Sequence, residues 1–326
     1  MRLRAGAHGV YRAGFARGGV RNLRGADGFV PGVLVAGGAN VDVKVQAGGR
    51  IGEGISTPGR VRVVPGGVAR NVAEVLARLG ARVQLASVVG ADAWGTWLIA
   101  RTAAAGVDVS AVVCRRGRTG IYVTVEGCGV ADTGVVEAAP PSVWRHLPLE
   151  DADLVVLDAN PAPRVLRDLA RRARRLALVG TSPAKVVRLR SLLPRTWLLC
   201  LTEAEACALL GAGAGHPREA ADLARAVQVE GPQAVLITLG QGGLGLLRDD
   251  WTMTPAYPAR VVNATGAGDT AAGVVLFGLL TGWTPRRLLP RAALAAALTV
   301  RIWGNVHPGV GTVLVGARRG SGGRRA

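Results

Sequence analysis

The stretch Asn263-Ala-Thr-Gly-Ala-Gly-Asp-Thr-Ala-Ala-Gly273 decides how the fold of this chain is assigned. An apolar segment from Ala271 to Leu280 follows it and predicts a helix, while Arg260-Val-Val before it has the composition of a strand. Gly266 and Gly268 carry no side chains, so backbone N–H groups can converge where this helix begins. Unpaired N–H groups and the helix dipole both attract negative charge. We therefore expect an anion-binding turn at the start of the helix.

Asp269 lies in the first turn of the same predicted helix, beside those N–H groups. A carboxylate repels phosphate, so a site that only bound phosphate would not be expected to contain a carboxylate side chain. It is useful where a hydroxyl attacks phosphorus, because it accepts the hydroxyl proton. A glycine-rich turn with Asp as a helix cap is the simpler alternative. Because the whole stretch is intact, we interpret Asp269 as the base of a phosphoryl transfer.

Length and composition exclude several classes of protein. The chain has 326 residues, is 49% hydrophobic and contains four cysteines without the spacing of a metal finger. It can bury a large core, and its longest apolar run is about half the roughly 18 residues that a membrane-spanning helix needs. Membrane proteins, collagen-like fibres and disulfide scaffolds are therefore excluded. The chain also lacks G-x-x-x-x-G-K-[ST] and, after its first strand, G-x-G-x-x-G, which argues against P-loop and nicotinamide-binding enzymes.

The formal net charge of +18 is distributed unevenly along the chain. Residues 1–30 contribute +5 and residues 317–326 contribute +4, so half of the excess lies in two Gly-rich ends. We expect both to be disordered extensions, although the first is also Arg-rich and acid-poor, like some targeting segments. No aromatic-interleaved basic patch accompanies the charge, so we expect no specific nucleic-acid partner.

Strands alternate with helices from residue 31 onward, which predicts a mostly parallel sheet covered on both faces. Two stretches, at about 43–64 and 115–137, read as strands and turns without a helix, and we expect them to project from the core as a small lid sheet. The expected strands are 33–36, 83–89, 154–157, 176–179, 196–199, 234–239 and 244–247, and the expected helices are 68–79, 94–105, 163–174, 183–192, 203–210, 217–229, 268–281 and 285–302.

Two stretches together resemble the signatures of the ribokinase-like (PfkB-type) carbohydrate and nucleoside kinases. They are Gly66-Gly67-Val-Ala-Arg-Asn71-Val-Ala and Ala264-Thr-Gly-Ala-Gly-Asp-Thr. The resemblance covers nearly the whole chain apart from its ends and implies one kinase domain over residues 31–316. It implies a three-layer α/β/α core with a β-sheet lid, and ATP-dependent phosphoryl transfer to a primary hydroxyl. It further implies that Asp269 is the catalytic base and that Gly266, Ala267 and Gly268 form the anion hole.

The expected acceptor site suits a polyol. Asn40 and Asp42 follow the first strand, at the edge of the sheet where open α/β folds bind ligands. An amide and a carboxylate two residues apart can donate to and accept from neighbouring ribose hydroxyls. Gly66 and Gly67 would let the backbone approach a sugar, and Asn71 can point back toward it. The alternatives are a turn residue for Asn40, a solvated strand position for Asp42 and an exposed helical position for Asn71.

The expected ATP site begins at Thr238-Leu-Gly240-Gln-Gly-Gly243, which follows a buried strand and resembles the nucleotide-binding loop of the family, although a plain hairpin would look the same. The resemblance adds Thr265 to this site. Thr202-Glu-Ala-Glu205 stands where the family usually has Asn-x-x-Glu, a motif associated with Mg²⁺, so Glu205 is the candidate metal ligand and the role of Thr202 stays open. Lys185 is a candidate contact for the nucleobase or phosphate, or a solvated helical lysine.

Within the family, the first signature and its surroundings are most similar to the pseudouridine kinase branch. The resemblance implies phosphorylation of a ribosyl 5′-hydroxyl, with pseudouridine as the preferred acceptor, Mg²⁺ as cofactor and K⁺ as a further candidate ion. It places the enzyme in the cytoplasm, and exposed lid edges make a homodimer plausible. A ribose, fructose or adenosine kinase, a catalytically weak nucleoside-binding relative and a basic nucleic-acid-associated protein remain as alternatives. The lid segment is shorter than in relatives, which leaves the choice of nucleoside least determined.

Overall fold

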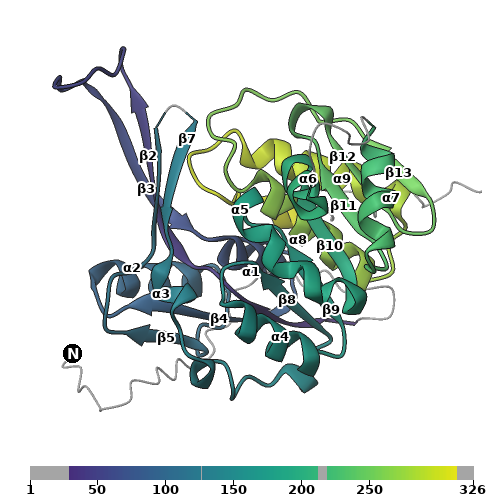
Figure 1. The fold of residues 1–326 in the computed structure, drawn as a ribbon. Coiled ribbons are helices and arrows are strands. Elements are labelled where there is room, and N and C mark those ends of the chain that lie inside the picture. Colours follow the sequence, from purple (N-terminus) through teal and green to yellow (C-terminus); the bar gives the residue numbers. More distant parts are fainter. Residues whose placement is uncertain (1–28, 126, 212–218, 314–326) are drawn as a thin grey trace, which may run out of the picture.

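The computed structural model describes residues 29–125, 127–211 and 219–313. Both expected extensions lie outside these residues, apart from positions 29 and 30. Within them, a nine-stranded sheet has the order β13-β12-β11-β10-β9-β8-β1-β4-β5 (Figure 1). Its strands are β1 (Gly32–Ala36), β4 (Arg82–Gly90), β5 (Val112–Arg115), β8 (Leu154–Asp158), β9 (Leu176–Val179), β10 (Thr196–Thr202), β11 (Val235–Thr238), β12 (Leu244–Leu247) and β13 (Trp251–Thr254).

All pairings from β5 to β11 are parallel, and β12 and β13 add an antiparallel edge. Parallel strands need crossovers, and helices supply most of them. The helices are α1 (Val68–Arg78), α2 (Ala93–Ala104), α3 (Gly134–Glu137), α4 (Pro163–Arg172), α5 (Pro183–Val186), α6 (Glu203–Leu210), α7 (Ala220–Val229), α8 (Ala267–Leu280) and α9 (Pro285–Thr299).

Side chains of the sheet alternate between two hydrophobic cores. Val33 and Val35 of β1 pack into the core that contains α1, α8 and α9, whereas Leu34 and Ala36 pack into the core that contains α4, α6 and α7. This alternation follows from the period of two in a strand, and a strand buried on both faces is apolar throughout. The structure therefore has the expected three-layer α/β/α core.

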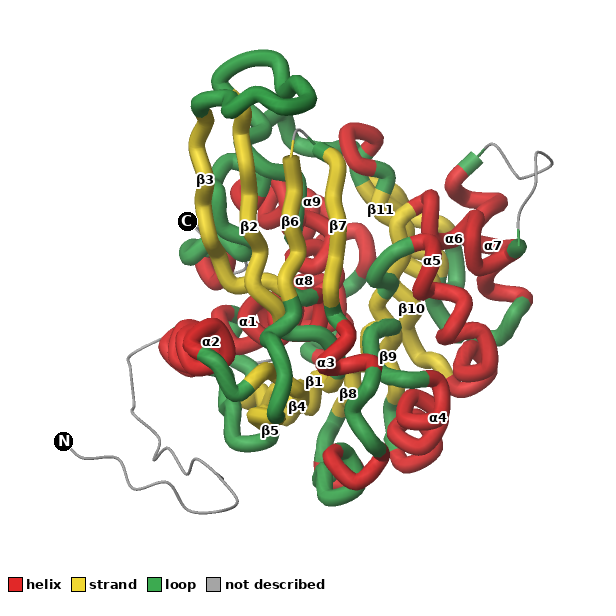
Figure 2. The backbone as a smooth tube through the Cα atoms, turned by 60° about the vertical axis from the view of Figure 1, so that its left-hand side comes forward, coloured by secondary structure: helices red, strands yellow, loops and turns green. Residues whose placement is uncertain are grey.

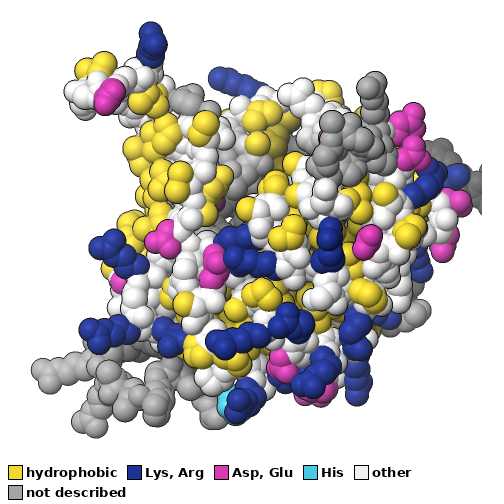
Figure 3. Space-filling view, in the orientation of Figure 1, with side chains coloured by type: hydrophobic (Ala, Val, Ile, Leu, Met, Phe, Trp, Pro, Cys, Tyr) yellow, Lys and Arg dark blue, Asp and Glu magenta, His cyan; other side chains and the backbone are white. Residues whose placement is uncertain are grey.

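A second sheet of four strands projects from the core, as expected for a lid. Its strands are β2 (Asn40–Ala47), β3 (Gly59–Gly66), β6 (Ile121–Val125) and β7 (Cys128–Asp132), in the order β3-β2-β6-β7 (Figure 2). Figure 3 shows hydrophobic side chains along this lid and basic side chains over the lower part of the core. The expected lid boundary at residue 115 was wrong, because residues 112–115 form β5 and extend the main sheet beside β4.

Two further expectations about local structure were wrong, and one strand was missed. Residues 260–262 are not a strand: Val261 and Val262 are 57% and 41% exposed, and Val262 N–H donates to the carbonyl of Val300. The expected helix at 183–192 is one α-helical turn that continues as a 3₁₀ helix, Val187–Arg195. The edge strand β13 was missed, because four residues of ordinary composition give little periodic signal. No helix among the described residues is long and apolar enough to cross a membrane.

Candidate active site

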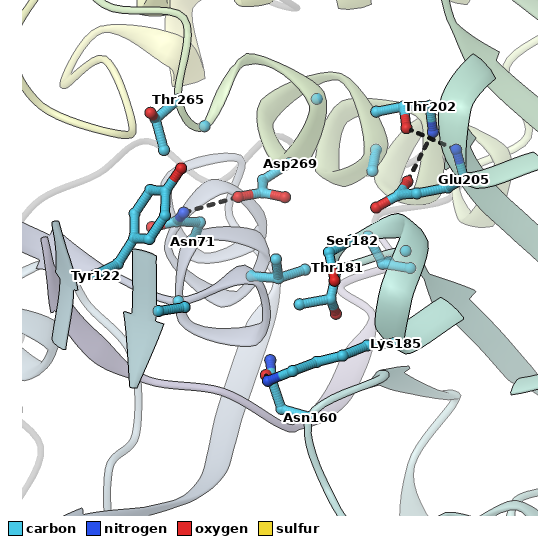
Figure 4. Close-up of a pocket in the computed structure, with 18 of the residues that line it drawn as sticks. Asn71, Tyr122, Asn160, Thr181, Ser182, Lys185, Thr202, Glu205, Thr265 and Asp269 are labelled. Carbon is cyan, nitrogen blue, oxygen red and sulfur yellow. Dashed lines mark hydrogen bonds between the residues drawn. The ribbon is translucent and has the colours of Figure 1, made fainter. Parts of the chain in front are cut away.

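A pocket of about 480 Å³ lies between the lid and the carboxyl ends of the central strands. Figure 4 shows Asp269 near its centre, with Glu205, Lys185 and Tyr122 around it. Of the residues singled out from the sequence, those that line the pocket are Asn40, Asp42, Gly67, Asn71, Lys185, Glu205, Thr238, Thr265, Gly266, Gly268 and Asp269. Gly66, Gly240, Gly243 and Ala267 do not line it.

The two signature stretches meet because each one begins a helix. Gly67 precedes α1 and Gly266 precedes α8, and both have a positive φ, 97° and 87°, that favours glycine. The helices pack closely: a Cβ on Gly273 of α8 would lie 2.6 Å from a methyl carbon of Val75 in α1. The N-termini of both helices therefore face the same pocket. In α1 the N–H groups of Ala69 and Arg70 are already bonded, to Asp158 Oδ2 and to the carbonyl of Gly38, so the dipole of α1 but not these donors is available to an anion.

Asp269 is held from the neighbouring helix. The side-chain amide of Asn71 donates a hydrogen bond to Oδ2 of Asp269 at 2.7 Å. Burial raises the pKa of Asp269 to about 7; the negative charges of Glu205, Asp158 and Asp42 add to this rise, and the Asn71 hydrogen bond opposes it. A carboxyl group with a pKa near neutrality, placed at a helix N-terminus, is suited to accept a proton in the transition state. Asn71 itself is 2% exposed, so the alternative of an exposed helical Asn is wrong.

Asp42 lies at the lid side of the pocket and is 2% exposed, so it is not a solvated strand residue. Its two oxygens accept hydrogen bonds from Asn40 Nδ2 and Asn305 Nδ2, each at 2.7 Å. Burial raises the pKa of Asp42, and these hydrogen bonds oppose the rise. Gly66 serves a different purpose from the one expected: a Cβ there would collide with the Asp42 carboxylate. Gly66 therefore makes room for Asp42 and does not line the pocket.

Glu205 is fixed by a capping box at the start of α6. Thr202 N–H donates to Glu205 Oε2 at 2.8 Å, and Thr202 Oγ1 accepts from Glu205 N–H at 3.2 Å. This gives Thr202 a structural role that the sequence left open. Glu205 is 5% exposed, and burial raises its pKa. Among the described residues, Oε1 has no hydrogen-bond partner, so it is available to a ligand.

Lys185 is neither a solvated lysine nor a lone charge. Its ammonium donates to Thr133 Oγ1 at 2.5 Å, to Glu137 Oε1 at 2.6 Å and to Asn160 Oδ1 at 3.0 Å. Arg188 donates to the other oxygen of Glu137 at 2.9 Å. These contacts hold the pKa of Glu137 at about 2, although partial burial acts in the opposite direction. Lys185 and Asn160 lie at one end of the pocket (Figure 4), and Glu137, which does not line the pocket, pairs with the Lys185 ammonium there.

The expected ATP residues separate into two groups. Thr238 ends β11 and lines the pocket with Thr265, whose N–H donates to Asn263 Oδ1 at 3.1 Å. Gly240 and Gly243 belong to the tight turn between β11 and β12, with φ values of 57° and 97°. At Gly243, a Cβ would collide with the backbone of Thr254 and Pro255. That glycine therefore allows the turn to approach β13.

The pfkB family carbohydrate kinase profile matches residues 31–306. The chain belongs to this family. It is therefore a ribokinase-family sugar or nucleoside kinase, a phosphotransferase with an alcohol acceptor. It shares its fold with ribokinases of known structure.

Individual members of the pfkB family match most of the chain. A pseudouridine kinase from Escherichia coli is 27% identical over 266 residues, which cover 77% of this chain and 83% of that protein. A cytidine kinase from Thermococcus kodakarensis is 29% identical over 262 residues, covering 76% and 91%. The structure of Arabidopsis thaliana ribokinase with ribose and ATP superimposes with a TM-score of 0.73 at 23% identity, covering 88% of this chain and 98% of that one.

Several residues in or directly behind the pocket were not singled out from the sequence. Asp158 ends β8, and its Oδ2 accepts hydrogen bonds from Gly38 N–H at 2.8 Å and Ala69 N–H at 3.1 Å. It joins the β1–β2 turn to the start of α1, the helix that carries Asn71. The position of Asp158 at a strand end was the available signal. Asn160, two residues further along, carried the same signal, whereas Tyr122 lacked any, because only the tertiary arrangement brings it to the pocket.

Proposed function

We propose that this pfkB-family kinase transfers the γ-phosphoryl group of ATP to the 5′-hydroxyl of a ribosyl substrate, with pseudouridine as the preferred acceptor. The observation that carries the proposal is Asp269, at the start of α8 with a pKa of about 7 and its carboxylate held by Asn71. Asp269 accepts the proton of the acceptor hydroxyl as that oxygen attacks the γ-phosphorus. The N–H groups of residues 266–268 offset the charge that develops on the transferred group.

The polar side chains on the acceptor side of the pocket suit a ribose. Asn40 and Asp42 line the pocket at the carboxyl edge of the sheet, 6% and 2% exposed, and they are already hydrogen-bonded to each other. Their orientation is therefore fixed before the sugar arrives, which lowers the entropy cost of binding. Adjacent ribose hydroxyls can donate to the Asp42 carboxylate and accept from Asn40. Two such contacts would fix the position of the ribose and thereby orient its 5′-hydroxyl.

The proposed binding site for the nucleobase is supported by the Lys185 cluster and by the similarity to pseudouridine kinase. Thr181 and Ser182 line the pocket close to Lys185, and Tyr122 lines it from the lid strand β6 (Figure 4). All three bring hydroxyl groups that both donate and accept. The pseudouracil ring presents two N–H groups and two carbonyl oxygens, which such a surface can pair. Uridine lacks one of these N–H groups because its ring nitrogen carries the sugar. Uridine is therefore the most informative competing substrate.

Glu205 fits the role of a metal ligand. A Mg²⁺ ion that accompanies ATP takes most of its ligands from phosphate oxygens and water and needs only one or two carboxylates. Glu205 offers Oε1 toward the pocket while Oε2 is held by Thr202. When bound, Mg²⁺ would neutralise charge on the phosphates. K⁺ is a further candidate ion, and titrating K⁺ in the activity assay tests whether it activates the enzyme.

The proposed function is tested by measuring ADP release with Mg-ATP and equal concentrations of pseudouridine, uridine, cytidine, adenosine, ribose and fructose. Selective turnover of pseudouridine, with formation of the 5′-phosphate, is the expected result. Turnover of another acceptor would retain Asp269 as the base and replace the substrate. Binding without turnover by correctly folded protein would favour a catalytically weak relative and refute the kinase proposal.

We also propose that the lid pairs with the lid of a second copy. Register places Val63, Val43, Val123 and Val130 in one row across the sheet, on the face opposite Asp42 and Tyr122. Val63 and Val130 are 37% and 76% exposed, so an apolar row faces outward. Light scattering of the intact chain tests this, with a Val130→Lys variant expected to be a monomer.

We also propose that the enzyme works in the cytoplasm, where ATP is available and its free cysteines stay reduced.

A further inference from the structure

Lys44 is a buried lysine that the proposed mechanism does not use. It lies on β2, two residues after Asp42, and is 2% exposed, but it does not line the pocket. Its ammonium donates to the backbone carbonyl of Trp303 at 3.0 Å and to Asn305 Oδ1 at 2.5 Å. Burial lowers the pKa of Lys44 to about 8, against the attraction of Asp42. A buried ammonium is costly unless it is fully paired, so its position requires a physical reason.

Asn305 connects Lys44 to the acceptor side of the pocket. It is 2% exposed, and its amide nitrogen donates to Asp42 Oδ2 at 2.7 Å and to the carbonyl of Pro65 at 3.0 Å. Its amide oxygen accepts from Lys44. The ammonium therefore determines which end of the Asn305 amide points at Asp42, because a cation accepts no hydrogen bond and pairs only with the oxygen.

The same loop lies directly behind the anion hole. A Cβ on Gly266 would collide with the backbone of Asn305, so the loop and the turn are in contact. Asn263, which begins the anion-hole turn, donates through its side chain to the carbonyl of Gly304 at 3.4 Å. Residues 303–305 are thus bonded to the lid strand on one side and to the anion-hole turn on the other.

We propose that Lys44 is a positioning residue that anchors the loop 303–305 and thereby aligns the acceptor site with the anion hole. The inference rests on the proposed function of Asp42 and of the turn at Gly266. Phosphoryl transfer requires the acceptor oxygen and the phosphorus to be in line, and a misplacement of about 1 Å costs on the order of 100-fold in rate. Lys44 achieves this alignment without touching either substrate.

The test compares Lys44→Met with Arg62→Met. Met keeps most of the apolar volume and removes the charge, and Arg62 is the exposed residue opposite Lys44 in the β2–β3 register. For Lys44→Met, we expect kcat to fall roughly 10- to 100-fold and the KM of the acceptor to rise about tenfold, with the KM of ATP unchanged. Arg62→Met should match the wild type in all three constants. A fall in kcat alone would indicate loss of active protein and would overturn the inference.

Chemical rescue gives an independent readout. In Lys44→Ala, n-propylammonium should restore kcat and the acceptor KM, whereas sodium chloride at equal ionic strength should not; equal effects of both salts would overturn the inference. If the Lys44 variants do not fold, Asn305→Asp retains the size of the side chain but places a carboxylate against Asp42. It should raise the acceptor KM and lower kcat, and unchanged constants would overturn the inference. Normal turnover of Asp269→Asn would instead refute the proposed function.

Discussion

Replacing Asp269 with Asn removes one ionisable group and leaves the geometry of the site almost unchanged. The Asn71 amide donates to Oδ2 of Asp269 at 2.7 Å, and the carbonyl oxygen of an Asn side chain can accept the same hydrogen bond. The variant cannot accept the acceptor hydroxyl proton. General-base catalysis contributes about 100- to 10,000-fold, so we expect turnover to fall by that range while the KM of ATP stays within about twofold.

The same substitution should stabilise the fold. Asp269 has a pKa of about 7 in the folded protein and 3.8 as its ordinary value, so its charged form is disfavoured by folding. The penalty is absent below pH 3.8, grows as pH rises toward 7 and is constant above 7. A difference of about three pKa units corresponds to an upper limit of about 4 kcal/mol. Because the side chain is partly exposed in the pocket, we discount the expected gain of Asp269→Asn at pH 8 to about 1–2 kcal/mol.

Urea denaturation at pH 5 and pH 8, combined with ADP release assays, measures both effects on one variant. The free energy of unfolding of Asp269→Asn, relative to wild type, should be greater at pH 8 than at pH 5. Two results would refute the reasoning. Turnover like that of the wild type would remove Asp269 as the base, and a stability difference independent of pH would show that its pKa is not raised.

Three other measurements probe the same site. In the wild type, kcat/KM should fall tenfold per pH unit below about pH 7, which gives an acid limb in the pH profile. Asn71→Ala removes a hydrogen bond that favours the carboxylate of Asp269, so it should shift this acid limb to higher pH. An unshifted limb would contradict this assignment. Glu205→Gln keeps the capping box, so stability should change by less than about 0.5 kcal/mol, while the limb moves to lower pH and about tenfold more Mg²⁺ is required in activity titrations. Gly266→Ala should lower kcat about 100-fold and destabilise the fold by about 1–3 kcal/mol in urea, because its φ is 87° and its Cβ would collide with Asn305; a fully active variant would exclude an anion hole there.

The parts of the molecule that could be predicted from the sequence are those set by local spacing. Apolar residues at helical and strand periods gave most elements of the core, and the two signature stretches brought Asp269 and Asn71 to one site. Residues 260–262 show the limit of this reasoning. They have strand-forming side chains, but the N–H group of Val262 bonds to the carbonyl of Val300 at the end of α9, and the two valines face solvent. Tertiary hydrogen bonding thus overrides β propensity there.

Contacts between distant elements could not be predicted in this way. Lys44 and the Trp303 carbonyl are separated by 259 positions, and no period in the sequence relates them. The role of Gly66 was misassigned for the same reason, because the side chain that needs its space, Asp42, comes from the adjacent strand. The sequence identifies residues that can perform chemistry, whereas the packing of β2, β3 and the loop 303–305 determines what each one touches.

The pKa of Asp269, the proposed base, is a collective property of the groups around it. Burial is the main cause of the raised pKa of Asp269, and the charges of Asp42, Asp158 and Glu205, each held by hydrogen bonds of its own, add to it. Arg70 opposes them: it is buried in α1 and donates to the Asn71 amide oxygen. Burial lowers the pKa of Arg70 to about 10, and the charges of Asp42 and Asp269 oppose this, so Arg70 stays cationic at neutral pH. Removing any one carboxylate should therefore lower the pKa of the base, and removing Arg70 should raise it. The pH dependence of catalysis should therefore depend on the whole cluster of charges around Asp269.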